Sequence, residues 1–280
     1  MILSFLIVFF LFLLASFVLI DRFDEIFRKD INTKVIAHRA GGVHAPENTL
    51  AGLNKAIALK ADGAEIDVQR SKDGYYIINH DSSFTRLCSN AGKPEEMTLE
   101  EIRQLIISDP LFPNDPHPVA TLEEMMDTAK GKILLFIELK GNSADQKMAE
   151  DLVALIKEKD MQQQCILISL KYSLIDYIET THPEINTGYL TFAAFGKIGD
   201  LHCDYVGLEE EAASDTAIAS LHEAGKKVMV WTPNSESGQK KFLLSEADFI
   251  ITDRILQAEE MIASLNARED LEVIIDLLLR

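Results

Sequence analysis

Short apolar runs alternate with helical patterns along most of the chain. Between these runs, apolar residues recur every three or four positions, as Leu50, Leu53 and Ile57 do, which predicts amphipathic helices. The apolar character of 133–139 is nearly continuous, as is typical of parallel strands that are covered on both faces. Eight runs are predicted as strands, at 35–37, 64–68, 133–139, 166–170, 187–190, 205–208, 228–231 and 249–251.

This alternation predicts an α/β fold, a (β/α)8 TIM barrel over residues 34–265. A doubly wound open sheet is the alternative, but no G-x-G-x-x-G pattern follows the first strand to support it. Two capping boxes mark helix starts, Thr98 with Glu101 and Thr121 with Glu124. Between them lies 109–118, a loop rich in proline and aspartate that departs from the alternation. The tail 266–280 is predicted to be helical and could cap the barrel, meet a partner or lie on a membrane.

The N-terminus breaks this pattern because residues 1–20 are apolar and uncharged. About 20 apolar residues can cross a bilayer as a helix, which predicts a transmembrane helix at 1–20 and a polar linker at 21–33. A signal peptide is the main alternative, but no basic residue precedes the run, and Phe17-Val18-Leu19 is a poor cleavage context. A helix that is apolar all round is also difficult to place on a soluble domain.

We therefore expect the chain to be a single-pass membrane protein. Basic residues follow the helix, which by the positive-inside rule would leave the domain cytoplasmic, although acidic residues are mixed among them. We leave the side of the membrane open and slightly favour an extracytoplasmic catalytic domain.

The net charge of the chain excludes some classes of binding partner. The formal net charge of -18 repels nucleic-acid backbones, so we expect no nucleic-acid partner. An acidic protein that binds a phosphate also needs a cation to mediate the contact. The three cysteines lack C-x-x-C spacing, which argues against a zinc site or a disulfide framework.

Ionisable side chains follow several predicted strands, where a barrel of this kind places its active site. Glu65 and Asp67 lie two residues apart, so both point the same way on a strand. Together with Glu138 they form an all-oxygen set that suits a divalent cation, Mg²⁺ or Ca²⁺. Arg39 and Lys140 follow other strand ends and can offset the charge of a bound phosphate.

Two histidines, His38 and His80, also follow predicted strands. Their side chains suit proton transfer near neutral pH. A single histidine at a strand end is more often structural, and a single Glu-x-Asp is more often a solvated edge. Their joint occurrence at several predicted strand ends favours an active site.

At these positions the chain resembles the glycerophosphodiester phosphodiesterase family in the order and spacing of its motifs, over about residues 35–262. The matching motifs are His38-Arg39-Ala40-Gly41, Ala45-Pro46-Glu47-Asn48-Thr49, Glu65-Ile66-Asp67-Val68, Lys72-Asp73-Gly74, His80-Asp81, Glu138-Leu139-Lys140, Val230-Trp231-Thr232-Pro233-Asn234 and Ile251-Thr252-Asp253-Arg254.

The resemblance implies a barrel with a small insertion after the second strand, placed here at 87–121. It implies a divalent metal on Glu65, Asp67 and Glu138, with His38 and His80 as general acid and base in an order that stays open. Substrate contacts are implied for Arg39, Lys140, Glu47 and Trp231. Glu47 could instead be a structural residue before a helix cap, and Trp231 could be a core aromatic.

The expected activity is metal-dependent hydrolysis of glycerophosphodiesters to sn-glycerol 3-phosphate and an alcohol, by a phosphoric diester hydrolase. The expected partners are such a small or lipid-derived substrate and, through the N-terminal helix, a membrane. One alternative is phospholipase D-like action on lysophospholipids with the same fold. The other is a non-catalytic, membrane-anchored binding protein.

Overall fold

The computed structural model of the chain describes residues 30–193 and 198–278. Among these residues, Thr33–Glu259 form one compact unit, and those before Thr33 and after Glu259 belong to another. The transmembrane helix predicted at 1–20 and residues 21–29 of the predicted linker lie outside the described residues.

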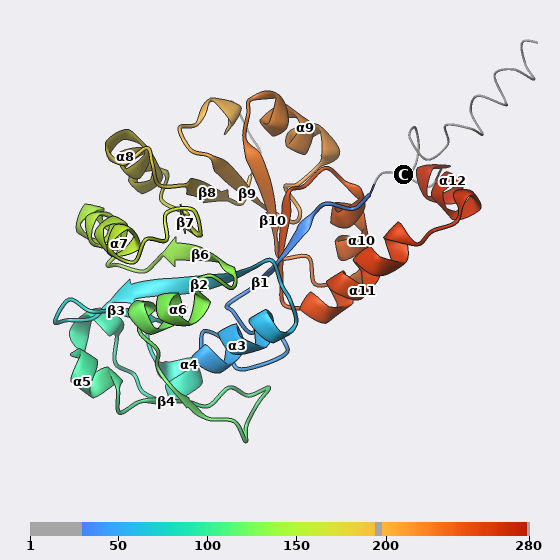
Figure 1. The fold of residues 1–280 in the computed structure, drawn as a ribbon. Coiled ribbons are helices and arrows are strands. Elements are labelled where there is room, and N and C mark those ends of the chain that lie inside the picture. Colours follow the sequence, from blue (N-terminus) through green and yellow to red (C-terminus); the bar gives the residue numbers. More distant parts are fainter. Residues whose placement is uncertain (1–29, 194–197, 279–280) are drawn as a thin grey trace, which may run out of the picture. The chain divides into compact units, whose positions relative to one another are not determined.

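The larger unit is built around a closed parallel barrel (Figure 1). Each barrel strand pairs in parallel with its neighbours, and the pairing of β1 with β2 closes the ring. The predicted TIM barrel is therefore confirmed. Its strands are β1 (Lys34–Ala37), β2 (Gly63–Arg70), β6 (Leu134–Leu139), β7 (Cys165–Ser169), β8 (Thr187–Thr191), β9 (Tyr205–Glu209), β10 (Lys227–Trp231) and β11 (Phe249–Thr252).

Side chains that point into the barrel fill its interior with apolar atoms. Phe136 packs edge-on against Tyr205 and Phe249, with ring centroids 6.3 and 5.4 Å apart. Ile36 and Met229 are fully buried in the same cluster. Each such side chain stabilises the fold by about 1.5–3 kcal/mol. Because apolar side chains fill the interior of the barrel, the polar side chains of a site can gather only at the carboxyl ends of the strands.

Helices surround the strands as the apolar spacing predicted (Figure 1). Several begin where a side-chain oxygen accepts from the first turn, as with Thr49, Asp145, Ser214 and Ser235. Between β8 and β9 the described residues contain only the short 3-10 helix η2 (Ile198–Asp200). The main helices are α3 (Leu50–Ala58), α6 (Leu122–Ala129), α7 (Gln146–Glu158), α8 (Tyr172–Thr181), α9 (Asp215–Glu223), α10 (Glu236–Leu244) and α11 (Ile255–Asn266).

An excursion separates β2 from α6, in the region where the sequence predicts the insertion. Its first strand, β3, pairs antiparallel with the end of β2, so the chain leaves the barrel pattern directly after Arg70. An apolar cluster that includes Phe84, Ile102 and Val119 gives the excursion a core of its own. Both predicted capping boxes form, at Thr98 and Thr121. The elements are β3 (Tyr76–Ile78), α4 (Thr85–Cys88), η1 (Pro94–Glu96), α5 (Leu99–Ile102), β4 (Ile106–Ile107) and β5 (His117–Pro118).

The smaller unit includes α12 (Asp270–Leu278), so the tail is helical as predicted. In this unit the Ile31 N–H donates to the Asn266 side chain over 2.9 Å. None of the helices among residues 30–193 and 198–278 is long and apolar enough to cross a bilayer. The localisation prediction is corrected on this finding, because a single-pass membrane protein is not supported. The domain boundaries given for the barrel and the tail stay predictions.

Candidate active site

Three buried carboxylates meet at the carboxyl end of the barrel, on two neighbouring strands. Glu65 and Asp67 lie on β2, and Glu138 lies on β6 as the register partner of Asp67. Only 4%, 1% and 7% of these residues is exposed, respectively. One oxygen from each carboxylate lies within 4.8 Å of the others. The two-residue spacing on β2 thus has the predicted effect, because both acidic side chains reach one point.

Burial and mutual repulsion make two of the three carboxylates hold their protons unusually well. Burial, followed by the charges of Asp67 and Glu138, raises the pKa of Glu65 well above its ordinary value. Burial and then Asp67 raise the pKa of Glu138 to about 7. Asp67 differs because Lys140, His80 and Asn48 outweigh the effect of burial and lower its pKa to about 2. The Lys140 ammonium lies 2.9 Å from Asp67 and 3.1 Å from Glu138.

Two buried polar atoms at this cluster lack a hydrogen-bond partner among the described residues, namely Oε1 of Glu65 and Nε of Arg39. The other Glu65 oxygen accepts from the Arg39 backbone N–H at 2.8 Å, and Arg39 Nε lies 4.0 Å from Asp67. A buried acceptor without a partner is costly, and a cation would satisfy it. The Arg39 donor correspondingly has no acceptor within hydrogen-bonding distance. The residues present therefore fit a divalent cation.

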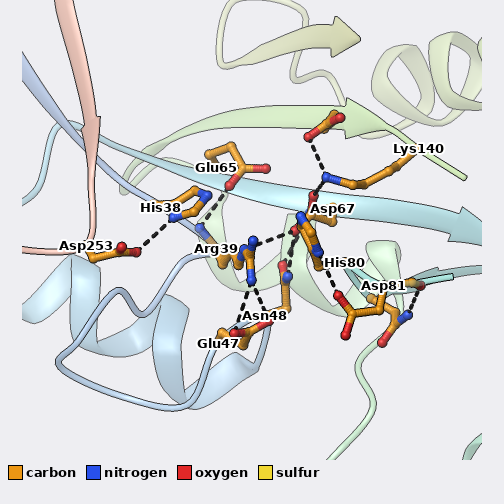
Figure 2. Close-up of polar contacts among 12 residues, drawn as sticks. His38, Arg39, Glu47, Asn48, Glu65, Asp67, His80, Asp81, Lys140 and Asp253 are labelled. Atoms are coloured by element: carbon orange, nitrogen blue, oxygen red, sulfur yellow. Dashed lines mark hydrogen bonds and ion pairs between the residues drawn. The ribbon is translucent and has the colours of Figure 1, made fainter. Parts of the chain in front are cut away.

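Each predicted acid–base histidine is held by a carboxylate (Figure 2). Nδ1 of His38 lies 2.8 Å from Asp253, and Nδ1 of His80 lies 2.8 Å from Asp81. An ionised carboxylate only accepts hydrogen bonds, so each neutral ring carries its proton on Nδ1 and leaves Nε2 free. Burial lowers the pKa of His80, which keeps that ring neutral near pH 7.

The loop after β1 supplies a second layer of polar contacts. The Asn48 amide donates to Asp67 at 2.8 Å and accepts from the Asp67 N–H at 3.2 Å. Arg39 donates to both oxygens of Glu47, at 3.1 and 3.2 Å. Arg39 and Asn48 have positive φ values of 48° and 55°, which non-glycine residues rarely adopt. The loop accepts this strain while it brings Arg39 and Asn48 to the carboxylates.

Trp231 lies at the end of β10, in another part of the mouth. Its Nε1–H donates to the Gly207 carbonyl at 3.2 Å. Its ring packs edge-on against Phe192, with centroids 5.0 Å apart. The Phe192 side chain is 65% exposed, so this aromatic pair borders the solvent. Trp231 therefore lies between the apolar core of the barrel, against which it packs, and the exposed Phe192, whereas the other predicted residues gather around the carboxylates.

Several polar residues of this site were not given a role by sequence reasoning. Asp81 directly follows His80. Asp253 lies two residues after the buried Ile251, so strand alternation could have indicated that Asp253 faces the site. Asn234 holds Asp253 through a 2.5 Å hydrogen bond. Arg86, in α4, carries no sequence signal of its own, because one partner, Asp81, is five residues away and the other, Glu47, is 39 residues away.

Comparison with known proteins decides the family. The model of the Glycerophosphoryl diester phosphodiesterase family matches residues 38–257. This chain belongs to that family. The prediction of a phosphodiesterase is thereby confirmed, and the cluster of Glu65, Asp67 and Glu138 supplies a possible site for the divalent metal of this metal-dependent family.

Relatives in this family match the chain over most of its length. A glycerophosphodiester phosphodiesterase of Caldanaerobacter subterraneus subsp. tengcongensis is 29% identical over 237 residues, which cover 80% of this chain and 95% of that protein. A glycerophosphodiester phosphodiesterase of Bacillus subtilis is 30% identical over 74% of this chain and 79% of its own. An Oleispira antarctica phosphodiesterase, solved with the product sn-glycerol-3-phosphate, shares 26% identity and a TM-score of 0.75, covering 82% of this chain and 96% of its own.

Proposed function

We propose that this protein hydrolyses a glycerophosphodiester to sn-glycerol 3-phosphate and an alcohol, with a divalent cation held by Glu65, Asp67 and Glu138. One observation carries the proposal. A buried acceptor without a partner, Glu65 Oε1, and a buried donor without a partner, Arg39 Nε, adjoin the same carboxylate cluster. A cation and an anionic phosphate, bound together, would satisfy both atoms.

The charges of the site support phosphate binding. Mg²⁺ or Ca²⁺, when bound, would neutralise carboxylate charge and polarise a phosphate oxygen. Arg39 and Lys140 bind the phosphate oxygens and offset the charge of the diester. Lys140 already lies between Asp67 and Glu138, so its ammonium is placed at the edge of the cluster. Glu47 holds the Arg39 guanidinium in place.

The two histidines move the protons. One Nε2 takes the proton of the glycerol 2-hydroxyl as that oxygen attacks phosphorus and a cyclic phosphate forms. The other ring starts protonated on both nitrogens and donates its Nε2 proton to the leaving alcohol as its P–O bond breaks. Water then opens the cyclic phosphate with the roles of the rings reversed, which gives glycerol 3-phosphate. Either His38 or His80 can start as the base, since both are held through Nδ1.

Lysophospholipids are a second candidate substrate class, with the same bond broken. Exposed apolar side chains near the carboxyl ends of β7 and β8 favour them, because Leu170 is 41% exposed and Phe192 is 65% exposed. Together with Trp231, they could cover an acyl chain or the apolar part of another alcohol. In this proposal Trp231 contacts the alcohol portion of the substrate.

The test is release of glycerol 3-phosphate from glycerophosphocholine by the purified chain, with EDTA and then with Mg²⁺ or Ca²⁺ restored. Metal-dependent release is the expected result, and micellar lysophospholipid is assayed alongside to separate the two substrate classes. A folded protein that binds the cation but releases product from neither substrate would overturn the proposed activity.

A further inference from the structure

Arg86 joins two parts of the active site without touching the carboxylate cluster. It lies in α4, within the excursion that follows β2. Its Nε–H donates to Asp81 at 2.7 Å. Its two terminal nitrogens donate to the two oxygens of Glu47, at 2.9 and 2.6 Å. One guanidinium therefore binds carboxylates from two loops, 34 residues apart along the chain (81 minus 47).

Each of these carboxylates has its other contact in the site itself (Figure 2). The second oxygen of Asp81 holds Nδ1 of His80 at 2.8 Å. Glu47 also accepts from the Arg39 guanidinium, whose Nε lies 4.0 Å from Asp67. A continuous chain of polar contacts thus runs from the carboxylate cluster through Arg39, Glu47, Arg86 and Asp81 to His80.

We propose that Arg86 is a positioning residue that fixes the proton-transfer histidine and the phosphate-binding arginine relative to each other. The proposal rests on the roles proposed above for His80 and Arg39. Arg86 acts through Asp81 on the tautomer and orientation of the His80 ring. Through Glu47 it acts on the Arg39 guanidinium.

The shape of the guanidinium explains why one residue can do both. Its five N–H donors lie in one plane, so separate edges can bind two carboxylates at once, whereas an ammonium acts as a point charge. The Glu47 side chain is only 15% exposed and the Asp81 side chain 30%. Loss of Arg86 would leave Glu47 with Arg39 alone, and would free one oxygen of Asp81 to rotate away from His80.

The other histidine is held differently. Asp253 orients His38, and the neutral Asn234 amide holds Asp253 from the neighbouring strand end, both as a donor and as an acceptor from the Asp253 N–H. That arrangement belongs to the barrel itself, between β10 and β11. The His80 arrangement depends on a charged residue of the excursion. Substitution of Arg86 should therefore affect His80 and leave His38 unchanged.

The test compares Arg86→Ala and Arg86→Lys with matched control variants at Arg103. Arg103 follows α5 in the same excursion, and its side chain is 35% exposed against 40% for Arg86. It also pairs with a carboxylate at 2.6 Å, on Glu124. Arg103→Ala thus loses an ion pair that does not reach the site, and Arg103→Lys makes the same exchange of guanidinium for ammonium away from the site.

We expect Arg86→Ala to lower kcat by about 10- to 100-fold and to raise KM, as removal of such supporting contacts typically does. Arg86→Lys should recover only part of that loss. The Arg103 variants should keep kcat and KM within about twofold of the wild-type values. A double variant with Asp81→Asn should lose less than the sum of its single losses, because both substitutions break one chain of contacts.

Long-range ¹H–¹⁵N spectra of the imidazoles give a readout that does not depend on turnover. In the wild-type protein His80 should carry its proton on Nδ1, and Arg86→Ala should mix the two tautomers while the His38 signals stay in place. The proposal is overturned if an active, folded Arg86→Ala matches Arg103→Ala in kcat, KM and His80 tautomer. Should Arg86→Ala fail to fold, the same comparison for Arg86→Lys decides. A wild-type protein without turnover would contradict the proposed function, whereas the spectra would still test the coupling.

Discussion

The mouth of the barrel has two unlike sectors. At the ends of β1, β2 and β6 the side chains are charged, largely buried and paired with one another, as Asp67 and Lys140 are. At the ends of β7, β8 and β10 the corresponding positions hold Leu170, Phe192 and Trp231, with Glu209 on β9 as the polar exception. The same alternation of side chains produced both sectors. In the function proposed above, the charged sector cleaves the bond and the apolar sector contacts the alcohol.

The largest effect should follow from loss of either histidine in the charged sector. His38→Ala or His80→Ala should lower kcat by about 10²- to 10⁴-fold, because a positioned acid or base typically contributes that much. The measurement is release of glycerol 3-phosphate under saturating metal. His117→Ala is the control, since His117 pairs with Asp115 in the excursion and lies outside the carboxylate cluster. Near-full activity in either active-site variant would contradict the two-histidine mechanism.

Next in size is the effect of the metal on stability, and it should depend on pH. In the metal-free protein the pKa of Glu138 is about 7, whereas the ordinary pKa of a glutamate is 4.5. Between these values the unfolded chain releases a proton that the folded protein retains, so a rise in pH favours unfolding. Glu65, whose pKa is also raised, acts in the same direction.

Thermal unfolding in EDTA should therefore show a loss of Tm from about pH 5 to about pH 7.5 that Glu138→Gln reduces, because that side chain no longer titrates. Added Mg²⁺ or Ca²⁺ should raise the wild-type Tm more at the higher pH, where the ligands are ionised. An identical pH dependence in the wild type and in Glu138→Gln would contradict the assignment of the proton to this cluster.

The smallest effect on the chemistry should come from the apolar sector. Phe192→Ala and Trp231→Ala should leave kcat for glycerophosphocholine within a few-fold of the wild-type value and should mainly raise KM. The lost contacts stabilise the bound substrate and the transition state equally. The ratio of kcat/KM for lysophospholipid to that for glycerophosphocholine should fall if these rings cover an acyl chain. A loss of kcat as large as in the histidine variants would contradict the division between the sectors.

Sequence periodicity predicted the barrel because each strand is covered on both faces and each helix on one. It also placed Glu65, Asp67 and Glu138 together, since two-residue spacing on parallel strands decides which side chains share a face. It did not predict the contacts of Arg86, which depend on how loops far apart in sequence approach each other. The bounds of the insertion stay a prediction, because β3, which pairs antiparallel with the end of β2, lies between that strand and residue 87.

The position of β3 has a consequence for how this site could arise or be altered. His80 and Asp81 follow β3, a strand that lies outside the closed ring, whereas the three carboxylates and His38 belong to the ring itself. The cation ligands and one of the two proposed proton carriers are thus encoded in separable segments. Replacement of residues 71–120 by a short turn would leave a ring that retains its ligands but lacks one proton carrier. Exchange of this segment between related barrels is therefore a route by which reactivity could change while ion binding is preserved.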